Sequence, residues 1–156
     1  MSPRSYKIEE TVDFAAETAM VRSMLLETWR YPEFIEHVDS ARVISRSSTA
    51  NEVAFRAKFI LELNYTVRTW LTEDGGVAFE QQTGHGTLHG RWRFIDERPA
   101  DGRGCRAHYE LSAEVPPLLP VFVIESILQM QLPRMLADFR RRAEELARSE
   151  LIGVAR

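Results

Sequence analysis

The fold is decided in residues 104–148, whose sequence is GCRAHYELSAEVPPLLPVFVIESILQMQLPRMLADFRRRAEELAR. Apolar and polar side chains alternate over 104–115, as in the run Tyr109, Glu110, Leu111. A period of two is typical of a β-strand that buries one face, whereas a period near 3.6 is typical of a helix. The helical period replaces the period of two after Pro116 and Pro117. The sequence therefore predicts a strand over 104–115 and an amphipathic helix over 118–148. The apolar stripe of this predicted helix consists of Ile124, Ile127, Leu128, Leu132, Met135, Phe139 and Leu146.

Pro133 lies inside the predicted helix. Proline has no backbone N–H and its ring collides with the carbonyl group four residues earlier, so we expect a kink that opens room beneath the helix. The helix would be about 45 Å long at ~1.5 Å per residue. Seven strands at ~4.8 Å spacing span only about 34 Å, so the helix is long enough to cross a sheet of that width.

Five further strands are predicted before residue 104, at 38–48, 52–60, 62–73, 77–83 and 87–96. Turn residues separate them, notably Asp74–Gly76, Gly84–Gly86 and Pro99–Gly102. The resulting six strands follow one another without an intervening helix. Parallel neighbours would require long crossover connections, so the series predicts an antiparallel meander.

The N-terminal part adds one strand and two short helices. Residues 6–14 alternate with period two, and residues 15–29 change to helical spacing without Gly or Pro. Pro32 limits that helix, and residues 31–35 predict a second helical turn. The predicted order is strand, two helices, six strands and a long helix. We therefore expect one α+β domain over 1–156, in which a curved antiparallel sheet of about seven strands wraps around the C-terminal helix.

Composition narrows the function classes. The chain has 156 residues and a net charge of −3, which favours a single domain and gives no electrostatic reason to expect a nucleic-acid partner. Its most apolar run, Val115 to Ile124, contains three prolines and is shorter than the ~20 residues of a membrane-spanning helix. The N-terminal residues lack the apolar run of a secretory signal, and Cys105 is the single cysteine. These features predict a cytoplasmic protein without an integral membrane segment.

Four segments resemble a known family. They are Trp29–Val38 (WRYPEFIEHV), Leu88–Phe94 (LHGRWRF), Asp101–Arg106 (DGRGCR) and Ala137–Leu146 (ADFRRRAEEL). In this order they resemble the helix-grip superfamily, also called START-like or SRPBCC, and in particular its polyketide cyclase/dehydrase and coenzyme Q-binding branch. The resemblance implies the helix-grip fold and a cavity for lipophilic molecules such as quinones, polyketides or lipids. Some members of that superfamily are enzymes and many are carriers.

Polar residues on the predicted inner face are the candidate binding groups. Tyr65, Thr69 and Tyr109 share that face with aromatic side chains. A buried hydroxyl group needs a hydrogen-bond partner, which a ligand oxygen, a water or another buried group could supply. The predicted ligand-binding residues are Phe34, Phe55, Phe59, Tyr65, Thr69, Trp92, Tyr109 and Met135.

No catalytic or metal site can be assigned from the sequence. The chain contains no G-x-S-x-G, H-E-x-x-H, P-loop or G-x-G-x-x-G motif. His89 and His108 are predicted on the outward face of neighbouring strands, where they could approach each other, but no third ligand stands at metal-binding spacing. No metal or other cofactor is therefore expected. Glu10 and His37 remain candidates for acid–base chemistry, although a solvated surface position is the simpler explanation of each.

Three functions are consistent with these observations. The first is a binder of a hydrophobic small molecule such as a lipid, a quinone or a polyketide, held between the sheet and the C-terminal helix. The second is an enzyme of the polyketide cyclase/dehydratase type, in which Tyr65, Tyr109 and His37 would orient a reactive chain. The third is a protein interaction module. The oligomeric state is open at this stage.

Overall fold

The computed structural model describes residues 4–59, 61–95 and 104–153. The elements at the N-terminal end are β1 (Arg4–Phe14), α1 (Thr18–Leu26) and the 3₁₀ helix η1 (Thr28–Glu33). The remaining strands are β2 (Val38–Arg46), β3 (Ala50–Lys58), β4 (Glu62–Leu71), β5 (Val77–Thr83), β6 (Thr87–Ile95) and β7 (Cys105–Val115). The C-terminal helix consists of α2 (Val121–Ser126), a π-helical turn η2 (Ile127–Gln131) and α3 (Leu132–Gly153).

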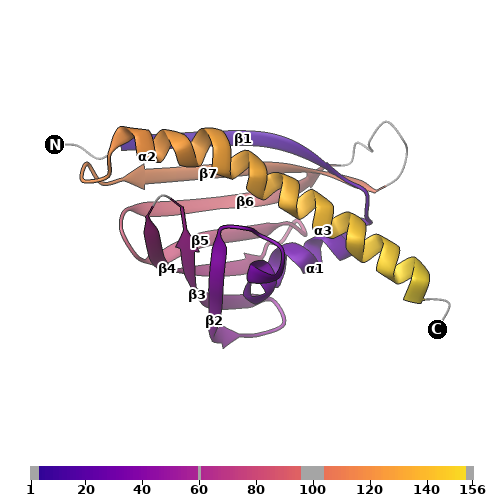
Figure 1. Ribbon diagram of the computed structural model, residues 1–156. Coiled ribbons are helices and arrows are strands. Elements are labelled where there is room, and N and C mark those ends of the chain that lie inside the picture. Colours follow the sequence, from indigo (N-terminus) through magenta and orange to yellow (C-terminus); the bar gives the residue numbers. More distant parts are fainter. Residues whose placement is uncertain (1–3, 60, 96–103, 154–156) are drawn as a thin grey trace.

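The seven strands form one antiparallel sheet in the order β1-β7-β6-β5-β4-β3-β2. Strands β2 to β7 are a meander, and β1 joins at the far side by pairing with β7. The C-terminal helix starts beside β1, crosses one side of the sheet and ends near α1 (Figure 1). The predicted fold class, an α+β helix-grip fold with a curved sheet and a long C-terminal helix, is confirmed.

The core lies where the sheet and the C-terminal helix meet. The predicted alternation is confirmed on β3, where Val53, Phe55 and Ala57 are buried. Trp92 on β6 joins the two layers, since its ring centroid lies 4.6 Å from that of Tyr109 on β7 and 5.6 Å from that of Phe139 on α3. Such tilted and edge-to-face aromatic pairs stabilise a core beyond the area they bury. The helix is thus anchored on the sheet by aromatic contacts.

The boundaries of the C-terminal helix differ from the prediction. The helix begins at Val121 and not at 118, because Pro120 has the extended backbone of a cap residue (φ −60°, ψ 144°). Near Pro133 the helix takes a π-helical turn, in which the N–H of Leu132 donates to the carbonyl oxygen of Ile127, five residues earlier. Irregularity was expected here because proline cannot donate to the helix ladder.

The first N-terminal helix is shorter than predicted, and the second begins three residues earlier than predicted. Residues 15–29 and 31–35 were expected to be helical, whereas α1 and η1 cover Thr18–Leu26 and Thr28–Glu33. A side-chain contact joins them, because the hydroxyl of Tyr31 donates a 2.6 Å hydrogen bond to the carbonyl oxygen of Leu25. The predicted turn at 99–102 and position 60 of the second predicted strand lie outside the described residues. In the described part of the chain, no helix is long and apolar enough to span a bilayer.

Candidate functional site

A cavity of about 190 Å³ lies between the sheet and the C-terminal helix. The helices α1, η1 and α3, the π turn η2 and six of the seven strands contribute to its wall; among the described elements, α2 and β1 do not. The lining residues are Leu25, Thr28, Tyr31, Ile35, His37, Val38, Phe55, Phe59, Tyr65, Val67, Thr69, Val77, Phe79, Leu88, Trp92, Tyr109, Leu111, Ile127, Gln131, Leu132, Met135 and Phe139. The wall contains no Asp, Glu, Lys or Arg among the residues that the structure describes. An interior of this kind accommodates uncharged, mostly apolar molecules.

The structure brings most of the predicted ligand-binding residues to this cavity. Those in the wall are Phe55, Phe59, Tyr65, Thr69, Trp92, Tyr109 and Met135. Phe34 is buried but lies outside the wall, with its ring centroid 5.7 Å from that of Tyr31 and 5.6 Å from that of Phe139. On its other side the guanidinium group of Arg142 lies 5.2 Å from its ring centroid. Phe34 therefore supports two residues of the wall from behind.

Sequence reasoning did not single out the contributions of the helices α1 and η1. Leu25, Thr28 and Tyr31 line the cavity from these two short elements. The helical spacing over 15–29 predicts a helix with one apolar face, but nothing in that pattern distinguishes a core residue from a residue that borders an empty space. The π turn contributes Ile127 and Gln131 in the same way.

Two polar groups of the wall already have partners within the protein. The hydroxyl of Thr28 donates a 2.7 Å hydrogen bond to Oδ1 of Asn51, and the phenol of Tyr31 donates to Leu25. Asn51 is buried, and its amide group also donates a 2.7 Å hydrogen bond to the carbonyl oxygen of Leu26. These contacts join α1, η1 and β3, so their role is to hold the wall together.

Three other hydroxyl groups of the wall have no hydrogen-bond partner among the described residues. Oγ1 of Thr69 is buried and unpaired. No hydrogen bond links the phenol groups of Tyr65 and Tyr109 to another described residue. Burial raises the pKa of Tyr65 to about 12. Burial, and then the neighbouring Tyr65, also raise the pKa of Tyr109. All three groups are thus neutral near pH 7 and can donate to an oxygen in the cavity.

His37 is the wall residue that titrates nearest to neutral pH. Its ring centroid lies 4.7 Å from that of Phe59, and the side chain is partly buried. Burial lowers its pKa below 6.5, and the nearby carboxylates of Asp138 and Glu36 oppose that shift. The imidazole is therefore neutral near pH 7, and it can act as a base or as a hydrogen-bonding group at the wall of the cavity.

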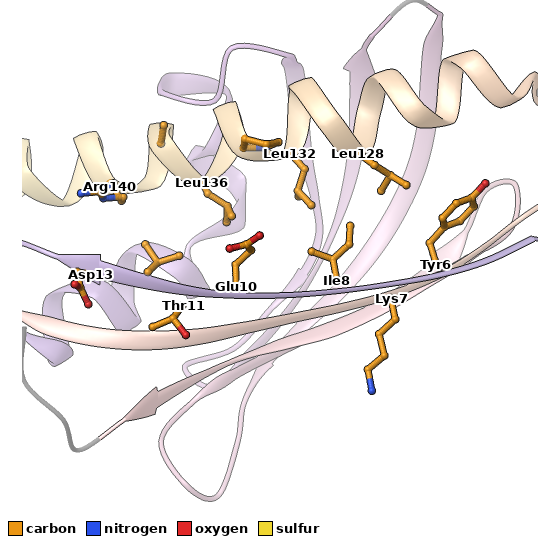
Figure 2. Close-up of a pocket in the computed structure, with 13 residues that line it drawn as sticks. Tyr6, Lys7, Ile8, Glu10, Thr11, Asp13, Leu128, Leu132, Leu136 and Arg140 are labelled. Carbon is orange, nitrogen blue, oxygen red and sulfur yellow. The ribbon is translucent and has the colours of Figure 1, made fainter.

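A second space, separate from the cavity, is a groove on the side of the C-terminal helix that faces β1. It has a volume of about 560 Å³ and lies between β1 and the helix. Figure 2 shows Ile8 and Glu10 pointing from β1 toward the helix, with Leu136 opposite them. Glu10 is exposed in this groove and does not reach the cavity, so the option of a buried carboxylate base at this position is excluded. Leu132 lines both spaces and separates them.

Residues 25–140 match the family described as polyketide cyclase / dehydrase and lipid transport. This match covers well over half of the chain and includes the end of α1, all of η1, strands β2 to β7 and the C-terminal helix as far as Arg140. The chain belongs to the polyketide cyclase/dehydrase and lipid transport family. The predicted resemblance is confirmed at this level. No match was found among curated protein sequences.

Several solved structures have the same fold as this protein. The Zhui aromatase/cyclase from Streptomyces sp. R1128 is 16% identical, with a TM-score of 0.72 over 90% of this chain and 94% of that one. A START superfamily protein from Mycobacterium smegmatis is 13% identical, with a TM-score of 0.70 over 90% and 98% of the two chains. Norcoclaurine synthase from Thalictrum flavum is 12% identical, with a TM-score of 0.62 over 92% and 89%. At these identities the likeness shows the fold, which is a hydrophobic ligand-binding fold, and not the ligand.

The outward face of the sheet in this family member carries a cluster that the sequence did not predict. The side chains of Glu9, His108 and Glu110 each have an oxygen or nitrogen atom that could bind a metal ion, and these three atoms lie within 4.8 Å of one another. Glu110 is already paired with Arg91, whose Nε lies 3.2 Å from its Oε2 and lowers the pKa of the carboxyl group. The sheet register also places His89 opposite Ser112, so His89 and His108 do not approach each other. The cluster is therefore held by ion pairs on the surface, away from the cavity.

Proposed function

We propose that this family member binds an uncharged, hydrophobic small molecule in the cavity between the sheet and the C-terminal helix. The observation that carries this proposal is the composition of the wall, which is mostly apolar and contains no carboxylate, ammonium or guanidinium group among the described residues. An apolar ligand gains about 25 cal/mol for each Å² of apolar surface that leaves water. A charged ligand would lose its hydration there without gaining a counter-ion.

The arrangement of the wall supports the same proposal. Pockets for small molecules are mostly apolar with a few convergent polar groups, and here three unpaired hydroxyl groups play that part. Family membership adds that the fold is one that binds hydrophobic molecules.

Native mass spectrometry of the gently purified protein tests this function, followed by extraction of any retained molecule. A matched pair of variants on the helix locates the binding site. Met135 lines the cavity, whereas Met130 is 51% exposed. We expect Met135→Trp to fill the cavity and abolish retention, and Met130→Trp to keep it. Apolar probes should raise the melting temperature of Met130→Trp but not that of Met135→Trp, because a ligand that binds only the folded state stabilises the protein.

The absence of any retained molecule, together with the absence of a thermal shift by apolar probes of graded size, would show that the cavity does not bind ligands. Equal retention by the two tryptophan variants would place the ligand elsewhere on the protein.

A second candidate function is catalysis at the same cavity. The neutral imidazole of His37 and the phenol groups of Tyr65 and Tyr109 face one space, and a base with oriented hydrogen-bond donors is what an aldol cyclisation or a dehydration requires. Turnover of a poly-β-ketone surrogate, lost in Tyr65→Phe and Tyr109→Phe, would favour this function. An inactive wild-type protein across several such substrates would count against it.

A further inference from the structure

The oxygen atom Oγ1 of Thr69 is fully buried in the cavity wall and has no hydrogen-bond partner among the described residues. The side chain is 1% exposed and lies on β4, which has neighbours on both sides: Asn51 of β3 and Phe79 of β5 stand opposite Thr69. A buried hydroxyl group without a partner costs roughly 1–3 kcal/mol, so its presence in a core needs an explanation.

The protein itself offers no partner for this group. The nearest polar side chain across the sheet is that of Asn51, which already accepts from Thr28 and donates to Leu26. The other unpaired hydroxyl groups, those of Tyr65 and Tyr109, belong to the same wall. A partner for the hydroxyl group of Thr69 would therefore come from a molecule in the cavity, either a ligand or a water.

The size of the cavity restricts the ligand. A volume of about 190 Å³ is only a little larger than the roughly 150 Å³ that accommodates benzene in an apolar core. It is smaller than the roughly 300–1,000 Å³ of pockets for drug-sized molecules. A single ring with a short substituent fits, whereas a long acyl chain or a fused polycyclic molecule does not.

We infer that the ligand is a compact, uncharged ring compound and that its carbonyl oxygen accepts a hydrogen bond from Oγ1 of Thr69. This inference rests on the proposed function, since it specifies the ligand of the same cavity. Thr69, Tyr65 and Tyr109 are all neutral hydroxyl groups, so the cavity is rich in donors that match a carbonyl acceptor. Thr69 provides the specificity of the site, and the aromatic wall provides the apolar contact.

Three probes and three variants test this inference by isothermal titration of the full chain. The probes are acetophenone, isopropylbenzene, which has the same shape without the carbonyl group, and hexadecanoate, which is long and charged. Thr69→Val removes the hydroxyl group at constant shape, and Thr69→Ser retains it. Thr66→Val is the matched control on the same strand, because the hydroxyl of Thr66 pairs with that of Thr83 on the exposed side of the sheet.

We expect wild type to bind acetophenone more tightly than isopropylbenzene. Thr69→Val should weaken acetophenone binding about tenfold and leave isopropylbenzene binding unchanged. Thr69→Ser and Thr66→Val should both keep the wild-type preference. Hexadecanoate should not bind.

The other outcomes separate this inference from the proposed function. If both ring probes bind and Thr69→Val changes the affinity of neither, the cavity binds ligands but the hydroxyl of Thr69 does not contact them. That result overturns the inference about Thr69 and leaves the proposed binding function intact. If hexadecanoate binds in one-to-one ratio, the inferred ring compound is wrong and so is the uncharged character of the proposed ligand, while binding of a hydrophobic molecule stands. If neither ring probe binds wild type and no other apolar probe does, the proposed function fails and the inference fails with it.

Discussion

Asp138 on α3 accepts a 3.2 Å hydrogen bond from the backbone N–H of Glu36, which lies 102 residues earlier in the chain. Arg141, one turn further along α3, pairs with Asp138 at 3.0 Å and donates a 3.1 Å hydrogen bond to the carbonyl oxygen of Phe34, two residues before Glu36. The segment held in this way leads directly to His37 in the cavity wall. The second half of the C-terminal helix is therefore fastened to the cavity by polar contacts as well as by its aromatic face.

Asp138→Ala should lower the free energy of unfolding by about 1–3 kcal/mol, because the backbone N–H of Glu36 loses its acceptor and Arg141 loses its partner. Urea unfolding followed by circular dichroism measures the change. Glu144→Ala is the control on the same helix, since Glu144 is exposed and its pairing with Arg148 spans 3.9 Å. The control should change stability by less than about 0.5 kcal/mol, and an equal loss in both variants would refute a special role for Asp138.

Asn51→Leu should destabilise the protein by about 2 kcal/mol or more, because the buried hydroxyl of Thr28 loses its acceptor and the carbonyl oxygen of Leu26 loses the donor that Asn51 provides. Asn64→Leu on β4 is the matched control, since Asn64 is exposed. Thermal and urea unfolding of both variants measure the difference. A stable Asn51→Leu protein would mean that the contacts between β3 and the two short helices are dispensable.

Gly90→Ala should be strongly destabilising, by about 2 kcal/mol or more. A Cβ atom at Gly90 would collide with the carbonyl oxygen of Glu110 and would lie 2.6 Å from Cζ of Phe79, a residue of the cavity wall. The ring of Phe79 would have to move into the cavity, so ligand retention should fall together with stability. Thr87→Ala, at an exposed position of the same strand, should alter neither quantity. A Gly90→Ala protein with wild-type stability would contradict the packing of Phe79 against this strand.

His37 predicts a pH dependence of stability. Burial keeps its pKa in the folded protein below the 6.5 of an unperturbed histidine. Between pH 6.5 and that lower value the unfolded chain binds the proton and the folded chain does not, so the free energy of unfolding decreases as the pH falls through this window. Above it both states are neutral and His37 contributes no slope. Urea unfolding at a series of pH values from 8 to 5 measures the effect.

His37→Gln should reduce the slope in that window, whatever it does to the absolute stability. His89→Gln is the control, because His89 is exposed on the outward face of β6. A slope that stays unchanged in His37→Gln would assign the pH dependence to other groups.

The sequence alone was sufficient for the fold class. Alternation on strands such as β3 and β7 marks which side chains are buried, and the change of period near 118 predicts the long helix, which begins three residues later at Val121. These signals are local, because burial of one face repeats every two residues in a strand and about every 3.6 in a helix. The order of the elements then leaves few ways to pair the strands. Element ends were less predictable: the short helices shifted by several residues where capping and tertiary contacts, such as that of Tyr31 with Leu25, decide.

Only the tertiary structure decided which buried residues border the cavity. Phe34 and Phe55 carry the same signal in the sequence, yet Phe55 lines the wall and Phe34 packs behind it against Tyr31. The unpaired state of Thr69 is equally invisible in the sequence, because it depends on Asn51 being engaged by two other elements. Periodicity reports that a side chain leaves water. Whether it then meets another side chain or an empty space depends on how the π turn, the short helices and the sheet fill one volume together.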